Sequence, residues 1–245
     1  MSGNRSRNGT LGLGVLLLFL DMTKFGLKEI PPVTLVAILG QVSLFLGVIT
    51  VPWDKWDVCL SADKVWNSLE FRRMLLSTLE HADDMHLYFN MGSLLLKGSF
   101  LERKYWSANF SILILFFTLT TNAIYVSLAL GLSYILNNPA VMESCAIGFS
   151  GVLFALKVVT TQESRPTYMQ IEGLWVDSRY APWVELIAIH FAVPNASFLG
   201  HLAGILAGVL YAKTFVGRHV DEAIEKFTGR TVEHDVYYYN IFEDD

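Results

Sequence analysis

Long apolar stretches separated by short polar ones make up most of this chain. A helix needs about twenty mainly apolar residues to cross the hydrocarbon core of a bilayer. Six stretches approach or exceed this length, and we predict that each forms a membrane-spanning helix, at residues 33–49, 85–101, 108–136, 145–159, 180–193 and 198–216. The pattern therefore predicts an all-α polytopic membrane protein with six transmembrane helices.

The segments at the two ends of the chain are more polar. The apolar run at residues 11–20 is too short to span a bilayer. Arg5 and Arg7 precede it as in a secretory signal, but residues 21–24 (Asp-Met-Thr-Lys) offer no small-residue cleavage site. We therefore predict three regions: a cytosolic or interfacial segment at 1–30 that is not cleaved, one membrane domain at 31–216, and a short, partly disordered cytosolic tail at 217–245.

The composition supports lipid as the solvent of the central region. Of the 245 residues, 53% are hydrophobic and only 17% are charged, whereas soluble domains are about 25% charged. The net charge of −5 is modest, and the chain shows no basic stripe. A nucleic-acid partner is therefore not expected.

The distribution of basic residues orients the predicted helices, because cytosolic loops are enriched in lysine and arginine. With a cytosolic amino terminus, the two short loops on the opposite side, 137–144 and 194–197, contain no lysine or arginine. The long first loop holds four basic residues, but long loops follow the rule less closely. Both termini are therefore predicted to be cytosolic.

Small residues recur every fourth position on two of the predicted helices. They are Gly200, Gly204 and Gly208 on the sixth, and Gly151 and Ala155 on the fourth. A helix face without side chains lets another helix approach closely. Taken alone, these glycines indicate dimerisation or close packing. Because Ser150 and His201 stand beside them, the same packing could bring a serine and a histidine into hydrogen-bond contact, as an activated nucleophile requires.

Ser150 alone would be a weak signal, since intramembrane serines usually bond to their own helix backbone. The pattern also differs from the soluble-hydrolase elbow, which needs glycine two residues after the serine, where Val152 stands. However, Gly148 and Gly151 flank the serine and leave the backbone N–H groups accessible. A nucleophile therefore remains a reasonable hypothesis for this position.

His86 and Asn90 are four residues apart and share one face of the second predicted helix. Both can donate hydrogen bonds to an oxyanion. A polar clamp between helices is an equally good interpretation of the pair alone. A metal site is a weaker one, because the spacing of His81 and His86 is not that of a zinc protease helix and no third ligand is evident. We predict no metal and no cofactor.

The three motifs resemble the signatures of the rhomboid family of intramembrane serine proteases. They occur in the family's order, at residues 81–91 (His-Ala-Asp-Asp-Met-His-Leu-Tyr-Phe-Asn-Met), 148–151 (Gly-Phe-Ser-Gly) and 200–208 (Gly-His-x-x-Gly-x-x-x-Gly). The likeness covers roughly residues 31–216. The residues around the motifs are most similar to those of the animal branch of the family that resides in the endoplasmic reticulum.

This resemblance implies a six-helix fold whose active site opens to the lumen. Ser150 and His201 would form a catalytic dyad, and His86, Asn90 and Gly148, with the Ser150 backbone, would stabilise the oxyanion. Substrates would be transmembrane segments of other proteins, cleaved in the endoplasmic-reticulum membrane, as in quality control of membrane proteins. The fifth helix, ending at Pro194, would be a moving gate.

Other functions remain open. An inactive rhomboid-like protein that binds membrane clients is the main alternative, although such a protein would be expected to lack the serine or the histidine. A transporter or channel would usually show broken helices or charges along the midplane, whereas the three motifs here cluster toward one side.

The chain departs from the family pattern in three places. The Trp-Arg pair of the first loop appears as Arg72-Arg73. Glu-x-Arg after the second helix appears as Glu102-Arg103-Lys104, followed by Tyr105-Trp106 where glycine is usual in the family. These changes affect loop rigidity, since lysine cannot reproduce a bidentate arginine contact. The tail of the mammalian relative binds ubiquitin and the ATPase p97, but 217–245 shows no counterpart, so these partners are not assumed.

Four further residues are interpreted as structural. Glu185 and His190 are five apart, do not share a helical face, and are expected to form separate hydrogen bonds. Lys157 is expected to extend its ammonium group to the cytosolic interface. Cys59 and Cys145 would lie on the same oxidising side, where a disulfide is possible, but two free buried cysteines are the favoured interpretation.

Overall fold

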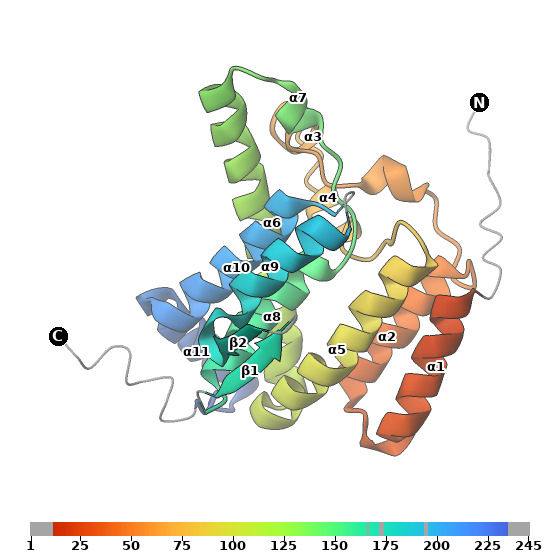
Figure 1. The fold of residues 1–245 in the computed structure, drawn as a ribbon, viewed down its shortest axis with the longest axis vertical. Coiled ribbons are helices and arrows are strands. Elements are labelled where there is room, and N and C mark those ends of the chain that lie inside the picture. The colour runs from red at the N-terminus through yellow and green to blue at the C-terminus, as the bar shows by residue number, and fades with distance from the viewer. Residues whose placement is uncertain (1–11, 166, 172–173, 194–195, 235–245) are drawn as a thin grey trace.

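The computed structural model describes residues 12–165, 167–171, 174–193 and 196–234, and this part of the chain is mainly helical (Figure 1). Short helices and turns occupy the connections, namely η1 (Leu27–Glu29), η2 (Lys55–Val58), α3 (Ala62–Trp66), α4 (Arg73–Leu76), α7 (Ala140–Glu143) and η3 (Ser178–Tyr180). The longer helices are α1 (Leu13–Phe25), α2 (Pro32–Phe45), α5 (Asp84–Tyr105), α6 (Ser107–Leu136), α8 (Ser150–Gln162), α9 (Ala181–Ala192), α10 (Phe198–Lys213) and α11 (Phe215–Thr228).

Each of the six predicted spans corresponds to a helix, in order α2, α5, α6, α8, α9 and α10. Within the described ranges, α6 is the one helix long and apolar enough to cross a membrane by itself, and α10 with α11 passes the same test as a pair bent by 77°. Helix α2 is apolar but shorter. The number of membrane-spanning helices therefore stays a prediction.

The structure also differs from the sequence prediction in secondary structure. Strands β1 (Tyr168–Ile171) and β2 (Leu174–Asp177) form an antiparallel hairpin with Tyr168 opposite Asp177, which the all-α prediction missed. The fourth helix begins at Ser150 rather than at residue 145. The tail predicted from residue 217 is helical up to Thr228, and residues 235–245 lie outside the described part.

Helices α8 and α10 lie at the centre of the bundle, with α6 packed against both and α5 packed against α8 (Figure 1). Large side chains fill the core between them, among them Tyr105, Tyr211, Phe110 and Phe117, which are fully buried. Their burial removes several hundred Å² of apolar surface from solvent. This packing holds the ends of α8 and α10 together, where the motifs lie.

Side-chain caps determine where two motif-bearing helices begin. The Asp83 carboxylate accepts a hydrogen bond from the His86 N–H at 2.8 Å, and the Ser197 hydroxyl accepts one from the Gly200 N–H at 3.1 Å. Such caps satisfy backbone donors that have no partner within the helix. They therefore order the first turns of α5 and α10, which carry two of the motifs.

Helix α1 packs along α5. The Asp84 carboxylate, at the first residue of α5, accepts hydrogen bonds from the backbone N–H groups of Gly14 and Val15. A Cβ atom on Gly14 would lie 2.4 Å from the Asp84 carbonyl oxygen. The two helices thus start at the same end of the bundle and run in the same direction.

Helix α2 returns in the opposite direction. At the far end of α5, the Glu102 carboxylate accepts hydrogen bonds from the N–H groups of Val33 at 2.8 Å and Thr34 at 2.7 Å. The predicted topology puts the amino terminus and the start of α5 on opposite sides of the membrane. In the structure the first turns of α1 and α5 lie at the same end of the bundle, because Asp84 caps α1. The side of the membrane on which the amino terminus lies stays a prediction.

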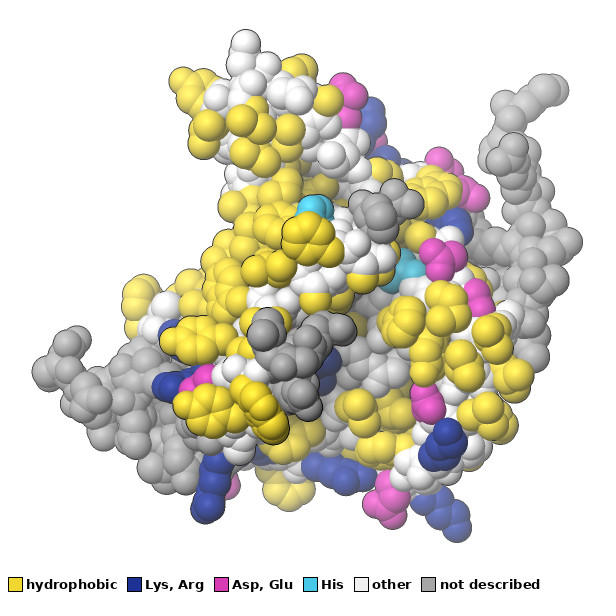
Figure 2. Space-filling view, viewed as in Figure 1, with side chains coloured by type: hydrophobic (Ala, Val, Ile, Leu, Met, Phe, Trp, Pro, Cys, Tyr) yellow, Lys and Arg dark blue, Asp and Glu magenta, His cyan; other side chains and the backbone are white. Residues whose placement is uncertain are grey.

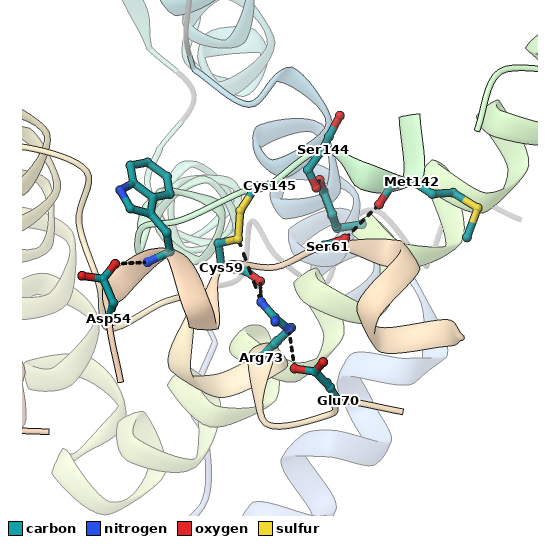
Figure 3. The surroundings of a disulfide bond; sticks show 10 residues. Asp54, Cys59, Ser61, Glu70, Arg73, Met142, Ser144 and Cys145 are labelled. Carbon is teal, nitrogen blue, oxygen red and sulfur yellow. Dashed lines mark hydrogen bonds and ion pairs between the residues drawn. A yellow bond between two sulfur atoms is a disulfide. The ribbon is translucent and has the colours of Figure 1, made fainter. Parts of the chain in front are cut away.

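A disulfide joins the first loop to the segment before α8, so the prediction of two free cysteines is wrong. Cys59 and Cys145 are bonded, with their Cα atoms 5.5 Å apart. Figure 3 shows Arg73 beside the bond, donating to the Cys59 carbonyl at 2.8 Å and to Glu70 at 2.9 Å. Arg73 is buried, whereas the Arg72 side chain is 64% exposed. Of the two arginines, Arg73 therefore anchors the loop.

The break between α5 and α6 occurs where the resemblance leads one to expect glycine. Trp106 stands there with a φ of +69°, a conformation that favours glycine. The Arg230 guanidinium lies over its ring, 4.3 Å from the centroid, and such cation–π contacts are favourable. The segment after α11 thereby contacts the turn that the bulky residue occupies.

Candidate active site

Ser150 and His201 are in hydrogen-bond contact. Ser150 is the first residue of α8, and His201 lies in the first turn of α10. The serine Oγ and the histidine Nε2 are 2.9 Å apart. The Phe154 ring lies 4.7 Å from the imidazole at an interplanar angle of 31° and restricts its orientation. Among the described residues, no carboxylate bonds to His201, so the arrangement is a pair and not a triad.

The glycine faces explain how two helix backbones come close enough for this contact. A Cβ atom on Gly204 would lie 2.0 Å from the Gly151 carbonyl oxygen, and one on Gly208 would lie 2.8 Å from the Ala155 carbonyl oxygen. These distances are far shorter than ordinary van der Waals contacts. The predicted packing of the fourth and sixth helices through their small residues is thus present within one molecule.

His86 lies against the segment that leads into α8. Gly148 has a φ of +120°, and a Cβ atom there would lie 2.6 Å from the His86 ring. The Gly148 N–H donates to the Ser77 carbonyl at 2.9 Å, which fixes this backbone. The imidazole therefore occupies the space that a side chain at position 148 would fill, two residues before Ser150.

Asn90 follows His86 one turn later on α5 and is buried. Its amide nitrogen donates to the His86 carbonyl at 2.7 Å, while its amide oxygen has no partner among the described residues. The predicted donor is thus engaged with its own helix. His81 is also buried, and neither of its ring nitrogens has a partner within the described ranges; its ring lies 5.2 Å from that of His86. Burial lowers the His81 pKa well below its usual value of 6.5, so the ring is neutral.

A water-sized cavity adjoins Ser150. Its volume is about 30 Å³, enough for one or two water molecules. Its lining includes the hydroxyl-bearing Ser77, Thr78, Thr121 and Ser197, and the Thr121 hydroxyl has no partner in the described chain. The cavity therefore offers polar space directly behind the serine.

Sequence reasoning missed the groups that support this site from a distance. Ser77 and Thr121 belong to none of the three motifs, and only the folded chain places them in the lining of the cavity beside Ser150. The backbone pairing of Leu60 with Ala146, at 2.7 and 2.9 Å, joins the first loop to the segment before α8. Contacts between two loops that are distant in the sequence cannot be predicted from the spacing of apolar residues.

The fifth predicted helix gives a mixed result. Glu185 forms an ion pair with Lys157 of α8, and the expectation that Lys157 extends to the cytosolic interface stays a prediction. His190 instead lies with its ring 5.2 Å from that of Phe198. The two α9 residues thus have separate partners, although an ion pair and a ring contact stand where separate hydrogen bonds were predicted. Within the described ranges, no group of three or more histidine, cysteine or acidic residues could hold a metal.

The chain is similar to known proteins over most of its length. The chain matches the Rhomboid domain family over residues 68–218. It is 43% identical to Rhomboid-related protein 4 of Mus musculus over 208 residues, covering 84% of this chain and 65% of the relative. The corresponding human protein is 41% identical, with the same two coverages.

More distant relatives have names that state a location or an activity. "Rhomboid-like protein 14, mitochondrial" of Arabidopsis thaliana is 36% identical over 86% of this chain and 64% of its own length. "Rhomboid-type serine protease 2" of Yarrowia lipolytica is 27% identical over 65% of this chain and 52% of its own length. The chain spans about 65% of the length of the mammalian relatives it matches.

Rhomboid proteins are embedded in membranes, which accords with the apolar flank in Figure 2 and with lysine and arginine side chains gathered mainly at its lower end. The family includes serine proteases and also inactive members. The domain match spans more than half of the chain and includes all three motifs. The chain therefore belongs to the rhomboid family.

Proposed function

We propose that this protein is an intramembrane serine endopeptidase that cleaves transmembrane segments of other membrane proteins. The observation that carries the proposal is the contact of 2.9 Å between Ser150 Oγ and His201 Nε2. A serine becomes a nucleophile when an adjacent base can take its proton. His201, held by the Phe154 ring, is in position to act as that base.

The proposed reaction follows the serine-protease scheme with a dyad. Ser150 Oγ attacks the peptide carbonyl carbon as His201 takes the hydroxyl proton, and His201 then returns it to the leaving amine. Water hydrolyses the acyl-enzyme and releases the acid product. The polar cavity beside Ser150 has room for that water.

His86 and the backbone N–H of Ser150 are the proposed oxyanion donors, with Asn90 joining them after its amide leaves the His86 carbonyl. Each donor in such a site contributes roughly 3 kcal/mol to transition-state stabilisation. The contact of His86 with Gly148 supports this assignment. A substrate must expose an extended bond, because a membrane helix hides its carbonyls in its own hydrogen bonds.

The similarity to mammalian Rhomboid-related protein 4 supports an endoplasmic-reticulum location and a role in membrane-protein quality control. The disulfide supports exposure of the Ser150 end of the bundle to an oxidising compartment, the lumen. In this topology, the end that carries Arg103, Lys104 and α11 faces the cytosol.

The test compares purified wild type, Ser150→Ala and His201→Ala in proteoliposomes with a fluorogenic transmembrane peptide. Both variants should lose a factor of about 10,000 or more in rate. Ser127→Ala is a matched control, because Ser127 bonds only to its own helix backbone at 2.9 Å. Equal cleavage by wild type and Ser150→Ala would remove Ser150 from the mechanism.

The alternative is a rhomboid-like protein that binds membrane clients without cleaving them. The engagement of the Asn90 amide with its own helix is the observation that favours it. Under this alternative, wild type would retain clients as efficiently as Ser150→Ala and would not react with a fluorophosphonate probe. Labelling of Ser150 by the probe would contradict it.

A further inference from the structure

An open groove lies along the last turns of α5, at the end of this helix away from His86. Its volume is about 630 Å³, and its lining includes Leu96, Phe100, Arg103 and Lys104. These α5 positions are three or four residues apart in turn, apart from the adjacent last two, and therefore lie on one helix face. The groove, here called the α5 groove, thus follows roughly two turns of the helix.

The wall of the α5 groove nearer the middle of the helix is apolar. Leu96 is 63% and Phe100 is 43% exposed, and Phe25, the last residue of α1, contributes its side chain to the lining. In a membrane, side chains of this kind lie against acyl chains, because the hydrocarbon core offers no partner for polar groups. The apolar wall therefore suits a hydrocarbon chain that runs parallel to α5.

Arg103 stands at the polar mouth of the α5 groove. Its side chain is 52% exposed, donates to the Glu29 carbonyl and lies 3.5 Å from the Glu29 carboxylate, which is itself exposed. An exposed ion pair contributes little to stability, and a guanidinium group has five N–H donors. Arg103 therefore has donors for a second anion and loses little if that anion displaces the Glu29 carboxylate.

The charges around the mouth favour an anion. Glu163, just after α8, belongs to the lining, but its buried carboxylate pairs with the Lys104 ammonium at 2.9 Å. Each of the two carboxylates at the mouth is thus matched by a cation of α5. Lys24 and Lys28 are exposed on either side of Phe25 in the sequence and add positive charge beyond this balance. Figure 2 shows lysine and arginine side chains gathered at this end of the molecule.

We propose that the α5 groove binds one phospholipid with an anionic head group, whose phosphate contacts Arg103 and whose acyl chain lies along Leu96 and Phe100. Basic pockets between membrane helices bind anionic head groups, and arginine binds phosphate through two parallel hydrogen bonds. The apolar wall is the reason to choose a lipid over a free phosphate ion, which has no use for it. This binding site goes beyond the proposed proteolytic function and does not depend on it.

Native mass spectrometry of the purified full chain in detergent measures the binding. Wild type should bind its first phosphatidylserine about tenfold more tightly than phosphatidylcholine with the same acyl chains, and added salt should reduce this preference. Arg103→Gln should abolish most of the preference and leave phosphatidylcholine binding unchanged. Arg72→Gln is the matched control, because Arg72 is an equally exposed arginine, 3.7 Å from the Glu70 carboxylate, in the first loop. It should keep the wild-type preference.

The apolar wall is tested separately. Phe100→Ala should weaken binding of both lipids by about threefold or more, since less apolar surface is covered. Phe89→Ala should change neither, because Phe89 is an exposed phenylalanine of the same helix that lies outside the groove lining. Glycerophosphoserine, which has the phosphate but no acyl chain, should not displace phosphatidylserine. If it does so at the same concentration as the lipid, the groove is a phosphate site and the lipid proposal is refuted.

The location of the lipid is mapped on the wild-type protein, without any variant that must fold. Phosphatidylserine with a photoreactive acyl chain, crosslinked in vesicles and analysed by peptide mass spectrometry, should label residues 96–104. Labelling spread as with photoreactive phosphatidylcholine, or a wild-type preference retained in Arg103→Gln, would overturn the proposal. None of these readouts involves cleavage, so failure of the proposed function would leave the outcome unaffected.

Discussion

Replacing Gly204 by alanine tests whether close approach of α8 and α10 creates the site. The added Cβ atom would lie 2.0 Å from the Gly151 carbonyl oxygen and 3.0 Å from the Phe154 Cβ atom. Optimal contacts between such atoms lie near 3.5 Å, so the helices must separate by more than about 1 Å. The Gly151 carbonyl oxygen and the Phe154 Cβ atom cannot move by side-chain rotation, so the helix backbones must move apart.

The displacement acts directly on the proposed dyad. Ser150 precedes Gly151, and His201 lies one turn before Gly204, so the contact of 2.9 Å between Oγ and Nε2 should open to roughly 4 Å, outside hydrogen-bond range. Loss of general-base catalysis costs about a factor of 100 to 10,000. Overpacking should also lower the free energy of unfolding by about 1–3 kcal/mol.

The assay is cleavage of a fluorogenic transmembrane peptide by Gly204→Ala in proteoliposomes, with fluorophosphonate labelling of Ser150 measured in parallel. Gly131→Ala and Gly92→Ala are matched controls, because a Cβ atom at either position meets nothing within 4 Å. Both controls should retain wild-type activity and labelling. If Gly204→Ala is as active as Gly131→Ala, the helix contact is not what positions the dyad.

Three further predictions concern the rest of the molecule. Cys59→Ser removes the disulfide, which links residues 86 apart in the sequence and restricts the unfolded chain. This variant should lower the free energy of unfolding by up to about 4–5 kcal/mol. A reductant should lower the midpoint of detergent-induced unfolding of the wild type but not of the variant. Burial lowers the pKa of His234, but its hydrogen bonds to Asp221 and Glu163 raise it more, to about 9. Docking of the segment after α11 should therefore be complete below about pH 6.5 and be lost as the pH rises through about 9. In limited proteolysis, an added protease should cut this segment of the wild type only at high pH. In His234→Ala it should cut the segment at every pH tested. Because α1 runs parallel to α5, a glycan-acceptor tag before Met1 should be glycosylated in microsomes and one after Asp245 should not, and the reverse result would contradict the direction of α1.

Much of the helical architecture follows from local pattern. Each of the six long apolar stretches forms a helix, since burial of apolar residues and internal backbone hydrogen bonding both favour helices in such segments. The capping residues Asp83 and Ser197 act within three residues of themselves. The spacing of glycines predicted dimerisation or close packing, because a helix face is a property of positions four residues apart. Ser150 and His201 beside them favoured packing of the fourth predicted helix on the sixth.

What the sequence could not determine depends on groups that are distant along the chain. Asp84 caps α1 from seventy residues away, and no local pattern in the sequence indicates this contact. The Lys157–Glu185 pair joins two helices whose relative rotation no local pattern specifies.

Only the folded chain decided how Ser150 and His201 meet and what surrounds them. The sequence by itself identified both residues through the glycines beside them and a family resemblance. The tertiary structure supplied the separation of 2.9 Å, the Phe154 ring over the imidazole and the disulfide that ties the first loop to the segment before α8. The physical reason is that helix periodicity describes one helix at a time, whereas a distance between two side chains depends on the packing of all their neighbours.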